Sequence, residues 1–351
     1  MVVDNFSGIY KNRRVLITGH TGFKGSWLAF WLKSLGADVI GFSLEADELS
    51  HYNLLELEIN HIVGNVDDYA TFKNILKEVK PEIIFHLAAQ PLVRESYNDP
   101  INNWKTNIMG AANLLDISRH IDEIKSIVMV TSDKCYKNIE SNYSYRETDV
   151  LGGIDPYSAS KACTEILISS FQKSFYYQSG KLIASARAGN VIGGGDFSSD
   201  RIIPDIFRSI SNSKVLNIRY PHAVRPWQHI LDCIYGYLLL GQKLLSSDPS
   251  FATSFNFGPE KSNEISVETL IKKVSNLWPN LIWDLDKNDN PHEATLLTLN
   301  NSKAKSHLGW NPYLNIDRTI ELTVNWYASY LEDNSLKSEE QLAEYTSILG
   351  K

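Results

Sequence analysis

Two side chains in the stretch DPYSASK, residues 155–161, have the types and the spacing needed to move a proton. If this stretch begins a helix, Tyr157 and Lys161 project from one face, one turn apart. Pro156 suits the first helical turn, because a proline there gives up no hydrogen bond. A tyrosine titrates near pH ~10, and an ammonium at ~4 Å in an effective dielectric constant of ~20 supplies the roughly 4 kcal/mol that moves its pKa to about 7. We therefore predict that Tyr157 is a general base and that Lys161 lowers its pKa.

A second polar cluster follows a predicted buried strand. The apolar run 124–131 leads into Ser132, Asp133 and Lys134, where a structural loop would more often turn with glycine or proline. Taken singly, this cluster could be a solvated loop, and an isolated YxxxK pattern could be a helix with one buried aromatic. Together, Ser132, Tyr157 and Lys161 provide the hydroxyl, phenol and ammonium that a nicotinamide-dependent alcohol oxidation requires.

A glycine-rich loop near the N-terminus has the form of a dinucleotide site. The apolar run 15–18 enters GHTGFKG, residues 19–25, and a helical pattern follows. Gly19 permits a tight turn, Gly22 lets the backbone approach a pyrophosphate, and Gly25 allows close helix packing. A plain glycine-rich turn is the alternative, but the strand before the loop and the helix after it favour cofactor binding.

The cofactor is expected to be NAD. The second predicted strand ends at Ser43, with Glu45 and Asp47 slightly later, and no lysine or arginine stands there to bind the 2′-phosphate of NADP. The predicted cofactor contacts are Gly19, Thr21, Gly22, Phe23, Gly25, Ser43, Asp67, Leu87, Ala88, Gln90, Tyr157 and Lys161.

The chain alternates between strand and helix patterns. We expect strands at 15–18, 38–43, 83–89, 124–131 and 183–187, and helices at 26–35, 69–79, 103–120 and 157–177. This alternation predicts an α/β fold: a Rossmann-type doubly wound parallel sheet with a smaller α/β C-terminal substrate domain. Ligands of such sheets collect beyond the carboxyl ends of the strands. The polar tail 333–351 is predicted to be a surface helix or to fray.

Composition excludes several classes of protein. A net charge of -7 and a pI near 5.7 give no electrostatic basis for binding nucleic acid or an anionic membrane. Cys135, Cys163 and Cys233 have neither metal-ligand nor disulfide spacing, so we expect no metal site and a cytoplasmic location. No secretory signal is expected, and the apolar run 234–240 is too short to span a bilayer.

Five stretches resemble the extended short-chain dehydrogenase/reductase family of nucleotide-sugar epimerases and dehydratases. They are GHTGFKGSWL (19–28), SDKCYKN (132–138), DPYSASKACTE (155–165), ARAGNVIGGGD (186–196) and RPWQH (225–229). Within the family they are most similar to 4,6-dehydratases, over nearly the whole chain. Dehydratases acting on dTDP-glucose or GDP-mannose carry glutamate where this chain has Lys134. The resemblance therefore implies CDP-glucose as substrate, and CDP-4-dehydro-6-deoxy-D-glucose and water as products.

The resemblance also implies an intramolecular redox cycle on tightly bound NAD. Tyr157 takes the proton of the sugar 4-hydroxyl while hydride leaves the same carbon, water is eliminated across carbons 5 and 6, and the hydride returns to carbon 6. Ser132 would orient the 4-oxygen, and Lys161 would also hold the nicotinamide ribose. Asp133 would protonate the departing hydroxide, and Lys134 would remove the 5-proton. A lysine that only contacts substrate or loop is an alternative interpretation of Lys134.

The second half is expected to bind the substrate. We predict that residues 1–189, with a returning segment near 226–250, form the NAD-binding domain and that residues 190–351 form the nucleotide-sugar-binding domain. Arg225 is the candidate for the diphosphate, because a guanidinium forks onto two oxygens. Asn190 would donate to the same group, and Arg201 is a further candidate that could instead form a structural ion pair. His292 lies in a stretch similar to one near the ligand in the family, but it is not included in the site.

Assembly and pathway are inferred from the resemblance alone. Helices 107–120 and 164–177 resemble the pair that forms a four-helix interface, which implies a homodimer or a dimer of dimers, although the same apolar positions fit core packing. The implied product is a precursor of deoxysugars in surface polysaccharides such as the O-antigen of lipopolysaccharide. A 4-epimerase, a dehydratase of another nucleotide sugar and a non-catalytic NAD-binding regulator are the alternatives. The presence of Asp133 beside Lys134 favours dehydration over epimerisation.

Overall fold

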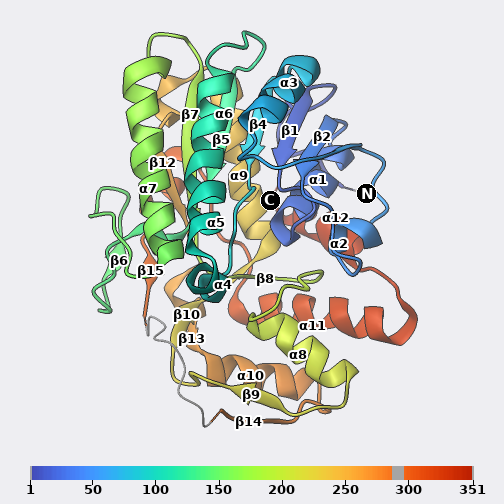
Figure 1. The fold of residues 1–351 in the computed structure, drawn as a ribbon. Coiled ribbons are helices and arrows are strands. Elements are labelled where there is room, and N and C mark those ends of the chain that lie inside the picture. The colour runs from blue at the N-terminus through green and yellow to red at the C-terminus, as the bar shows by residue number, and fades with distance from the viewer. Residues whose placement is uncertain (1, 287–295, 350–351) are drawn as a thin grey trace.

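A parallel seven-stranded sheet forms the centre of the protein (Figure 1), in the order β12-β7-β5-β4-β1-β2-β3. This computed structural model describes residues 2–286 and 296–349. The strands of the sheet are β1 (Arg14–Thr18), β2 (Asp38–Ser43), β3 (Asn60–Val63), β4 (Ile83–His86), β5 (Ser126–Val130), β7 (Leu182–Ala188) and β12 (Ser254–Phe257). The predicted α/β fold with a Rossmann-type parallel sheet is confirmed.

Helices cover both faces of the sheet, which explains why the strands are continuously apolar. Successive residues of β1 point to opposite sides: Ile17 packs in a core with α1 and α9, and Leu16 packs in a core with α3 and α6. The helices on the two faces are α1 (Phe23–Ser34) and α9 (Ile230–Leu245) on one, and α3 (Tyr69–Val79), α5 (Pro100–Trp104), α6 (Gly110–Ser118) and α7 (Pro156–Phe171) on the other.

Several predicted elements have the predicted bounds. Both β2 and α3 begin and end where the sequence pattern placed them. The helix expected at 103–120 is instead α5, a π-helical segment (Lys105–Met109) and α6 in succession, and a second π-helical segment (Gln172–Tyr176) extends α7. The edge strand β3 was not predicted, because it is short and partly exposed.

The part of the chain that follows β7 forms a smaller group of helices and strands at the lower end of the molecule in Figure 1. It also returns to the central sheet. Helix α9 packs against β5 and β7, and β12 is the edge strand beside β7. The division into two domains therefore stays a prediction. The remaining elements are α2 (His51–Leu54), α4 (Val93–Asn98), β6 (Ser144–Tyr145), β8 (Val191–Ile192), α8 (Ile202–Ser211), β9 (Leu216–Ile218), β10 (Val224–Pro226), β11 (Gln228–His229), β13 (Glu264–Ser266), α10 (Val267–Leu277), β14 (Trp283–Leu285), β15 (Thr298–Leu299), α11 (Ile316–Asp333) and α12 (Ser338–Ile348).

Of the two alternatives predicted for the polar tail, a helix is found: α12 covers Ser338–Ile348 and packs on the rest of the protein with one face. Leu342 and Tyr345 of α12 are buried, and the Tyr345 hydroxyl donates a hydrogen bond of 2.7 Å to Asp232 on α9. Asp232 also accepts hydrogen bonds from the backbone N–H groups of Tyr313 and Leu314, at 2.9 and 3.2 Å. The polar composition of residues 333–351 did not indicate this contact, because few apolar side chains of α12 are buried in it.

The strand order reverses at β1, which lies between β2 and β4. At such a switch point the connections leave β1 and β4 in opposite directions, and a crevice opens beyond the carboxyl ends of the strands. Within residues 2–286 and 296–349, every helix is too short or too polar to cross a membrane.

Candidate active site

A single cavity of about 810 Å³ lies at this switch point. Its lining combines the glycine loop after β1, the strand ends of β4 and β5, the first turn of α7, and α8 and β10 from the second half of the chain. The volume lies in the range typical of small-molecule sites. The cavity thus brings the predicted cofactor, catalytic and substrate residues together.

The glycine loop has the form of a cradle for a dinucleotide. Gly19 has a φ of +75°, and a Cβ atom there would lie 2.7 Å from the backbone nitrogen of Ala88. A Cβ atom on Gly25 would lie 2.1 Å from the carbonyl oxygen of Gly19. Only glycine fits these two positions, so the loop stays close to α1 and its backbone remains open to a ligand. These residues fit the pyrophosphate of NAD.

All but one of the predicted cofactor residues line this cavity. Thr21 and Ser43, on neighbouring strand ends, form a hydrogen bond of 2.7 Å between their hydroxyls. Asp67 is the exception: it is absent from the lining, and its carbonyl accepts a hydrogen bond of 3.1 Å from Asn113. The residues that do line it are Gly19, Thr21, Gly22, Phe23, Gly25, Ser43, Leu87, Ala88, Gln90, Tyr157 and Lys161.

The first two turns of α7 present Tyr157 and Lys161 to the cavity, one turn apart, as their spacing predicts. Asp155 caps the helix by accepting the N–H of Ser158 at 2.8 Å, and Pro156 occupies the first turn. The Lys161 ammonium lies 5.9 Å from the centre of the Tyr157 ring.

The expected lowering of the Tyr157 pKa is not found in the chain itself. Burial raises the pKa of Tyr157 to about 12, and an interaction with the Ser132 side chain opposes this only in part. Burial is the largest cause because an apolar surround penalises the phenolate. The charge of one nearby ammonium does not offset this desolvation. The pKa of Lys161 is itself lowered to about 8, first by burial and then by the charge of Lys24.

Ser132, Asp133 and Lys134 stand opposite Tyr157 at the end of β5. Ser132 caps the 3-10 turn Asp133–Cys135, accepting the N–H of Lys134 at 3.2 Å. Its hydroxyl donates to Asp133 at 2.9 Å, and the Lys134 ammonium lies 3.4 Å from the same carboxylate oxygen. Asp133 is fully buried, whereas Lys134 is about one-third exposed. The turn therefore places a hydroxyl, a carboxyl and an amine along one wall of the cavity.

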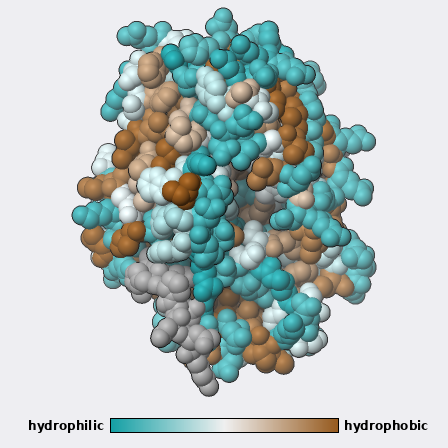
Figure 2. Space-filling view, viewed as in Figure 1, coloured by the Kyte–Doolittle hydropathy of each residue, from teal (hydrophilic) through white to brown (hydrophobic). Residues whose placement is uncertain are grey.

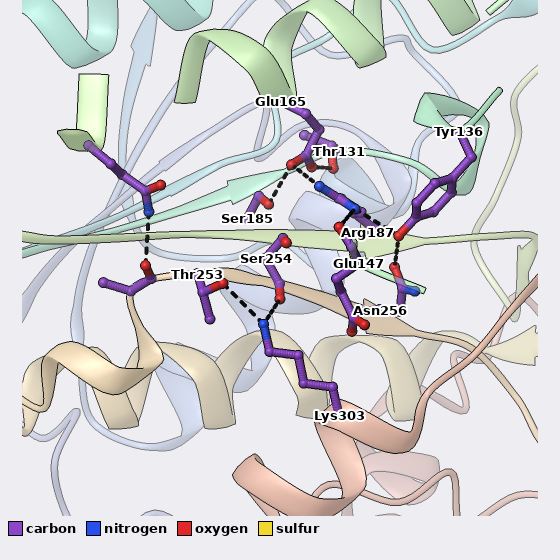
Figure 3. A network of polar contacts seen from close by, with 12 residues as sticks. Thr131, Tyr136, Glu147, Glu165, Ser185, Arg187, Thr253, Ser254, Asn256 and Lys303 are labelled. Atoms are coloured by element: carbon purple, nitrogen blue, oxygen red, sulfur yellow. Dashed lines mark hydrogen bonds and ion pairs between the residues drawn. The ribbon is translucent and has the colours of Figure 1, made fainter. Parts of the chain in front are cut away.

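A buried polar network joins α7 to the sheet behind this wall (Figure 3). Glu165, one turn beyond Lys161, accepts hydrogen bonds from the hydroxyls of Thr131 and Ser185 and pairs with Arg187 at 2.7 Å. Thr131 directly precedes Ser132. The network thus fixes the catalytic helix relative to the strand end that carries the Ser132 turn.

The same network continues toward the second half of the chain. Arg187 donates to the Tyr136 hydroxyl at 2.7 Å, and that hydroxyl donates to Asn256 of β12 at 2.7 Å. Tyr136 ends the turn that carries Asp133 and Lys134, so both ends of this turn are held by buried hydrogen bonds.

The predicted substrate residues come from the second half of the chain. Asn190, Arg201 and Arg225 all line the cavity. Arg201 directly precedes α8 and donates to Asp196 at 3.1 Å, so the ion pair predicted as an alternative is present. Arg225 lies on β10. His292 lies outside the described residues.

Comparisons with known proteins identify the family. A model of the GDP-mannose 4,6-dehydratase family matches residues 16–323. The chain is 42% identical to CDP-glucose 4,6-dehydratase of Salmonella typhimurium over 99% of both proteins. The chain belongs to the GDP-mannose 4,6-dehydratase family. Another relative is dTDP-glucose 4,6-dehydratase of Haemophilus influenzae, 25% identical over 89% of this chain and 97% of that protein.

Solved structures share the fold of this GDP-mannose 4,6-dehydratase family member. An epimerase from Methanothermobacter thermautotrophicus has a TM-score of 0.82 at 24% identity and covers 93% of this chain and 96% of its own. The dTDP-glucose 4,6-dehydratase of Bacillus anthracis, solved with NAD, has a TM-score of 0.76 at 21% identity over 92% of this chain and 98% of its own.

Sequence reasoning missed two charged residues of this family member's site. Lys24 lines the cavity from within the glycine loop, and Glu165 lies buried behind it. The position of Lys24 between two glycines of the cofactor loop could have indicated that its side chain lines the site. Glu165 could have been found from its spacing of four residues beyond Lys161, which places it on the same face of α7.

Proposed function

We propose that this protein is an NAD-dependent CDP-glucose 4,6-dehydratase, which forms CDP-4-dehydro-6-deoxy-D-glucose and water. The observation that carries the proposal is end-to-end similarity, at 42% identity, to a CDP-glucose 4,6-dehydratase. The cavity supports it, because Ser132, Asp133, Lys134, Tyr157 and Lys161 all line the same space.

The first task of the chain is to remove the proton of the sugar 4-hydroxyl. When bound, NAD supplies a hydride acceptor for carbon 4 and a hydride donor for carbon 6. Ser132 holds the 4-oxygen, and Tyr157 accepts its proton. Because burial raises the pKa of Tyr157 to about 12, positive charges must favour the phenolate: Lys161 lies beside the ring, and Arg201 already lowers the pKa.

The second task is to eliminate water. Departure of hydroxide from carbon 6 requires a proton donor, and loss of the 5-proton requires a base. We assign the donor role to Asp133 and the base role to Lys134. Their side chains are 3.4 Å apart, so both can reach adjacent carbons of one sugar.

The third task is to hold the nucleotide diphosphate. Arg225, Arg201 and Asn190, which line the cavity from the second half of the chain, would bind it. A guanidinium suits a diphosphate because its donors match two oxygens at once.

A homodimer is part of the proposal. Apolar side chains are exposed on neighbouring outer helices: Ile101 on α5, Met109 beside it, and Ile166 on α7 are each more than half exposed. Figure 2 shows hydrophobic surface over this region. A second copy of the same helices would cover such a patch symmetrically. A cytoplasmic location is also proposed, and the three unpaired cysteines support it.

The test is incubation of the purified protein with CDP-glucose, dTDP-glucose, UDP-glucose and GDP-mannose, followed by mass spectrometry of each product. We expect CDP-glucose to lose one water. Activity restricted to another nucleotide sugar would overturn the CDP assignment, and an isomerised product of unchanged mass would identify a 4-epimerase instead.

A further inference from the structure

Tyr136 is a buried residue beside the proposed acid and base, and the proposed reaction gives it no role. It ends the 3-10 turn Asp133–Cys135, which we call the catalytic turn, and it is 1% exposed. Its hydroxyl accepts a hydrogen bond of 2.7 Å from Arg187 and donates one of 2.7 Å to Asn256 (Figure 3). Its ring stacks on that of Tyr145, with the centroids 5.2 Å apart. The side chain is therefore fixed by three separate contacts inside the protein.

The two partners of this hydroxyl are themselves held in place. Asn256 lies on β12 and is fully buried, and its amide nitrogen donates to the carbonyl oxygens of Tyr145 and Asn300, at 2.8 and 3.2 Å. Arg187 lies on β7 and is also buried. Because β7 and β12 are neighbouring strands of the central sheet, Tyr136 ties the end of the catalytic turn to that sheet.

The backbone at the end of the catalytic turn pairs with a loop on the surface. The carbonyl oxygen of Cys135 accepts the N–H of Gly152 at 2.9 Å, and the N–H of Lys137 donates to the carbonyl oxygen of Val150 at 2.9 Å. Val150 is 69% exposed. Backbone hydrogen bonds to an exposed loop open more easily than those of a buried strand. This loop is thus a weaker support for the turn than the contacts of the Tyr136 hydroxyl with the sheet.

The beginning of the catalytic turn has a different support. Thr131 directly precedes Ser132, and the Thr131 hydroxyl donates a hydrogen bond to Glu165 on α7. The backbone N–H of Thr131 donates to the carbonyl oxygen of Ala186 on β7, at 2.9 Å. These bonds hold Ser132 near α7, the helix of the proposed base, and none of them involves Tyr136. The two ends of the turn are therefore supported independently.

We propose that Tyr136 is a positioning residue for the elimination of water, and that its hydroxyl acts by holding Asp133 and Lys134 in place. Oxidation at carbon 4 uses Ser132 and Tyr157, whose positions do not depend on this hydroxyl. Loss of the hydroxyl should therefore slow elimination and leave oxidation largely intact. The inference rests on the proposed function for the identity of the two steps, whereas the link between Tyr136 and the turn exists without a substrate.

The first test uses the thiol of Cys135 to report how often the catalytic turn opens in the full chain without sugar nucleotide. Cys135 and Cys233, which lies on α9, are both fully buried, so each reacts with N-ethylmaleimide when the structure around it opens. Tyr136→Phe removes the hydroxyl and keeps the ring. Peptide mass spectrometry follows the labelling. We expect the rate at Cys135 to rise about tenfold, as for the loss of one buried hydrogen bond, and the rate at Cys233 to stay unchanged.

Tyr176→Phe is the matched control for this variant. Tyr176 is also 1% exposed, and its hydroxyl donates a hydrogen bond of 2.6 Å to the carbonyl oxygen of Leu115, outside the cavity lining. In this control Cys135 should react at the wild-type rate. An unchanged rate at Cys135 in Tyr136→Phe, or an equal rise at Cys135 and Cys233, would overturn the proposal.

The second test determines which step of the reaction becomes slow. In Tyr136→Phe we expect kcat for water loss from CDP-glucose to fall by up to about 100-fold, because displaced catalytic groups lose their alignment, and KM to stay near the wild-type value. Deuterium at carbon 5 should then slow the reaction more than deuterium at carbon 4. Tyr176→Phe should keep the wild-type isotope effects. A larger isotope effect at carbon 4 in Tyr136→Phe would contradict a role in elimination.

A second variant acts on the same link from the other side. Asn256→Ala removes the acceptor of the Tyr136 hydroxyl and leaves Tyr136 in place, so labelling of Cys135 should rise in this variant too. It serves as the test if Tyr136→Phe does not fold. If the wild-type protein dehydrates no nucleotide sugar, the proposed function fails, and the labelling of Cys135 still decides the link. If dehydration proceeds and Tyr136→Phe matches the wild type in both tests, the link fails and the function stands.

Discussion

Tyr157 is the residue whose ionisation limits the proposed chemistry. Replacing it by phenylalanine removes one oxygen and keeps the buried ring, so we expect dehydration to fall by roughly 10²–10⁴-fold, the usual contribution of a general base. The rate of product formation from CDP-glucose, followed by mass, measures this loss.

Tyr177→Phe is the matched control, because Tyr177 is 65% exposed and lies outside the cavity. The control should retain wild-type activity. If Tyr157→Phe kept a rate within a few-fold of the wild type, another group would have to be the base.

Residue types and spacing were sufficient to predict which side chains meet, but not how they ionise. The pairs Tyr157 with Lys161 and Asp133 with Lys134 follow from one helical turn and one strand end. The pKa of Tyr157 depends on burial by distant parts of the chain, which no local pattern records. Asp67 is absent from the cavity lining, whereas Asn65 and Val66 just before it are part of that lining.

At the scale of elements, the Glu165–Arg187 pair fixes α7 against the sheet. Both side chains are at least 95% buried, so Glu165→Gln leaves a buried guanidinium without its counter-charge. We expect the free energy of unfolding to fall by about 3–5 kcal/mol. Chemical denaturation of the purified variant measures this change.

Asp317→Asn is the control for the Glu165 variant. It removes the 2.6 Å pair with Lys273, in which the Asp317 side chain is 73% exposed. Such a pair contributes under about 1 kcal/mol, so the control should be nearly as stable as the wild type. Equal losses in the two variants would contradict a special role for the buried network.

The contact between α9 and α12 predicts a dependence of stability on pH. Burial raises the pKa of Asp232 from 3.8 to about 7, so the folded chain binds a proton there that the unfolded chain releases. Stability from this group is fully present below about pH 4 and is lost as the pH rises through about 7. The advantage of the wild type over Asp232→Asn should therefore shrink across this window. Thermal unfolding at several pH values measures it, and a difference that grows with pH would refute the assignment.

Helices and strands with a regular pattern of apolar residues could be predicted from the sequence. Elements that depend on tertiary contacts could not. The bounds of β2 and α3 follow from an apolar run and from an amphipathic stripe that Asp68 caps. The packing of α12 depends on Tyr345 reaching Asp232, more than a hundred residues earlier. A contact between such distant positions produces no repeating pattern of apolar residues in the nearby sequence.

For the whole molecule, the exposed apolar face of α5 and α7 predicts self-association. Ile166→Asp places a charge on that face and should convert a dimer to a monomer in analytical ultracentrifugation. Ile282→Asp is the matched control, because Ile282 is similarly exposed but lies next to β14, away from these helices. A dimer that survives Ile166→Asp unchanged would place the interface elsewhere.

The fate of the hydrogen on carbon 4 of the sugar tests the central claim most directly. CDP-glucose carrying deuterium at carbon 4 would be mixed with unlabelled substrate of a distinguishable mass, and the products analysed after conversion by the enzyme. We expect the deuterium in the new methyl group of the molecule that originally carried it. Deuterium that is lost to solvent, exchanged between molecules or retained at carbon 4 would contradict the proposed mechanism.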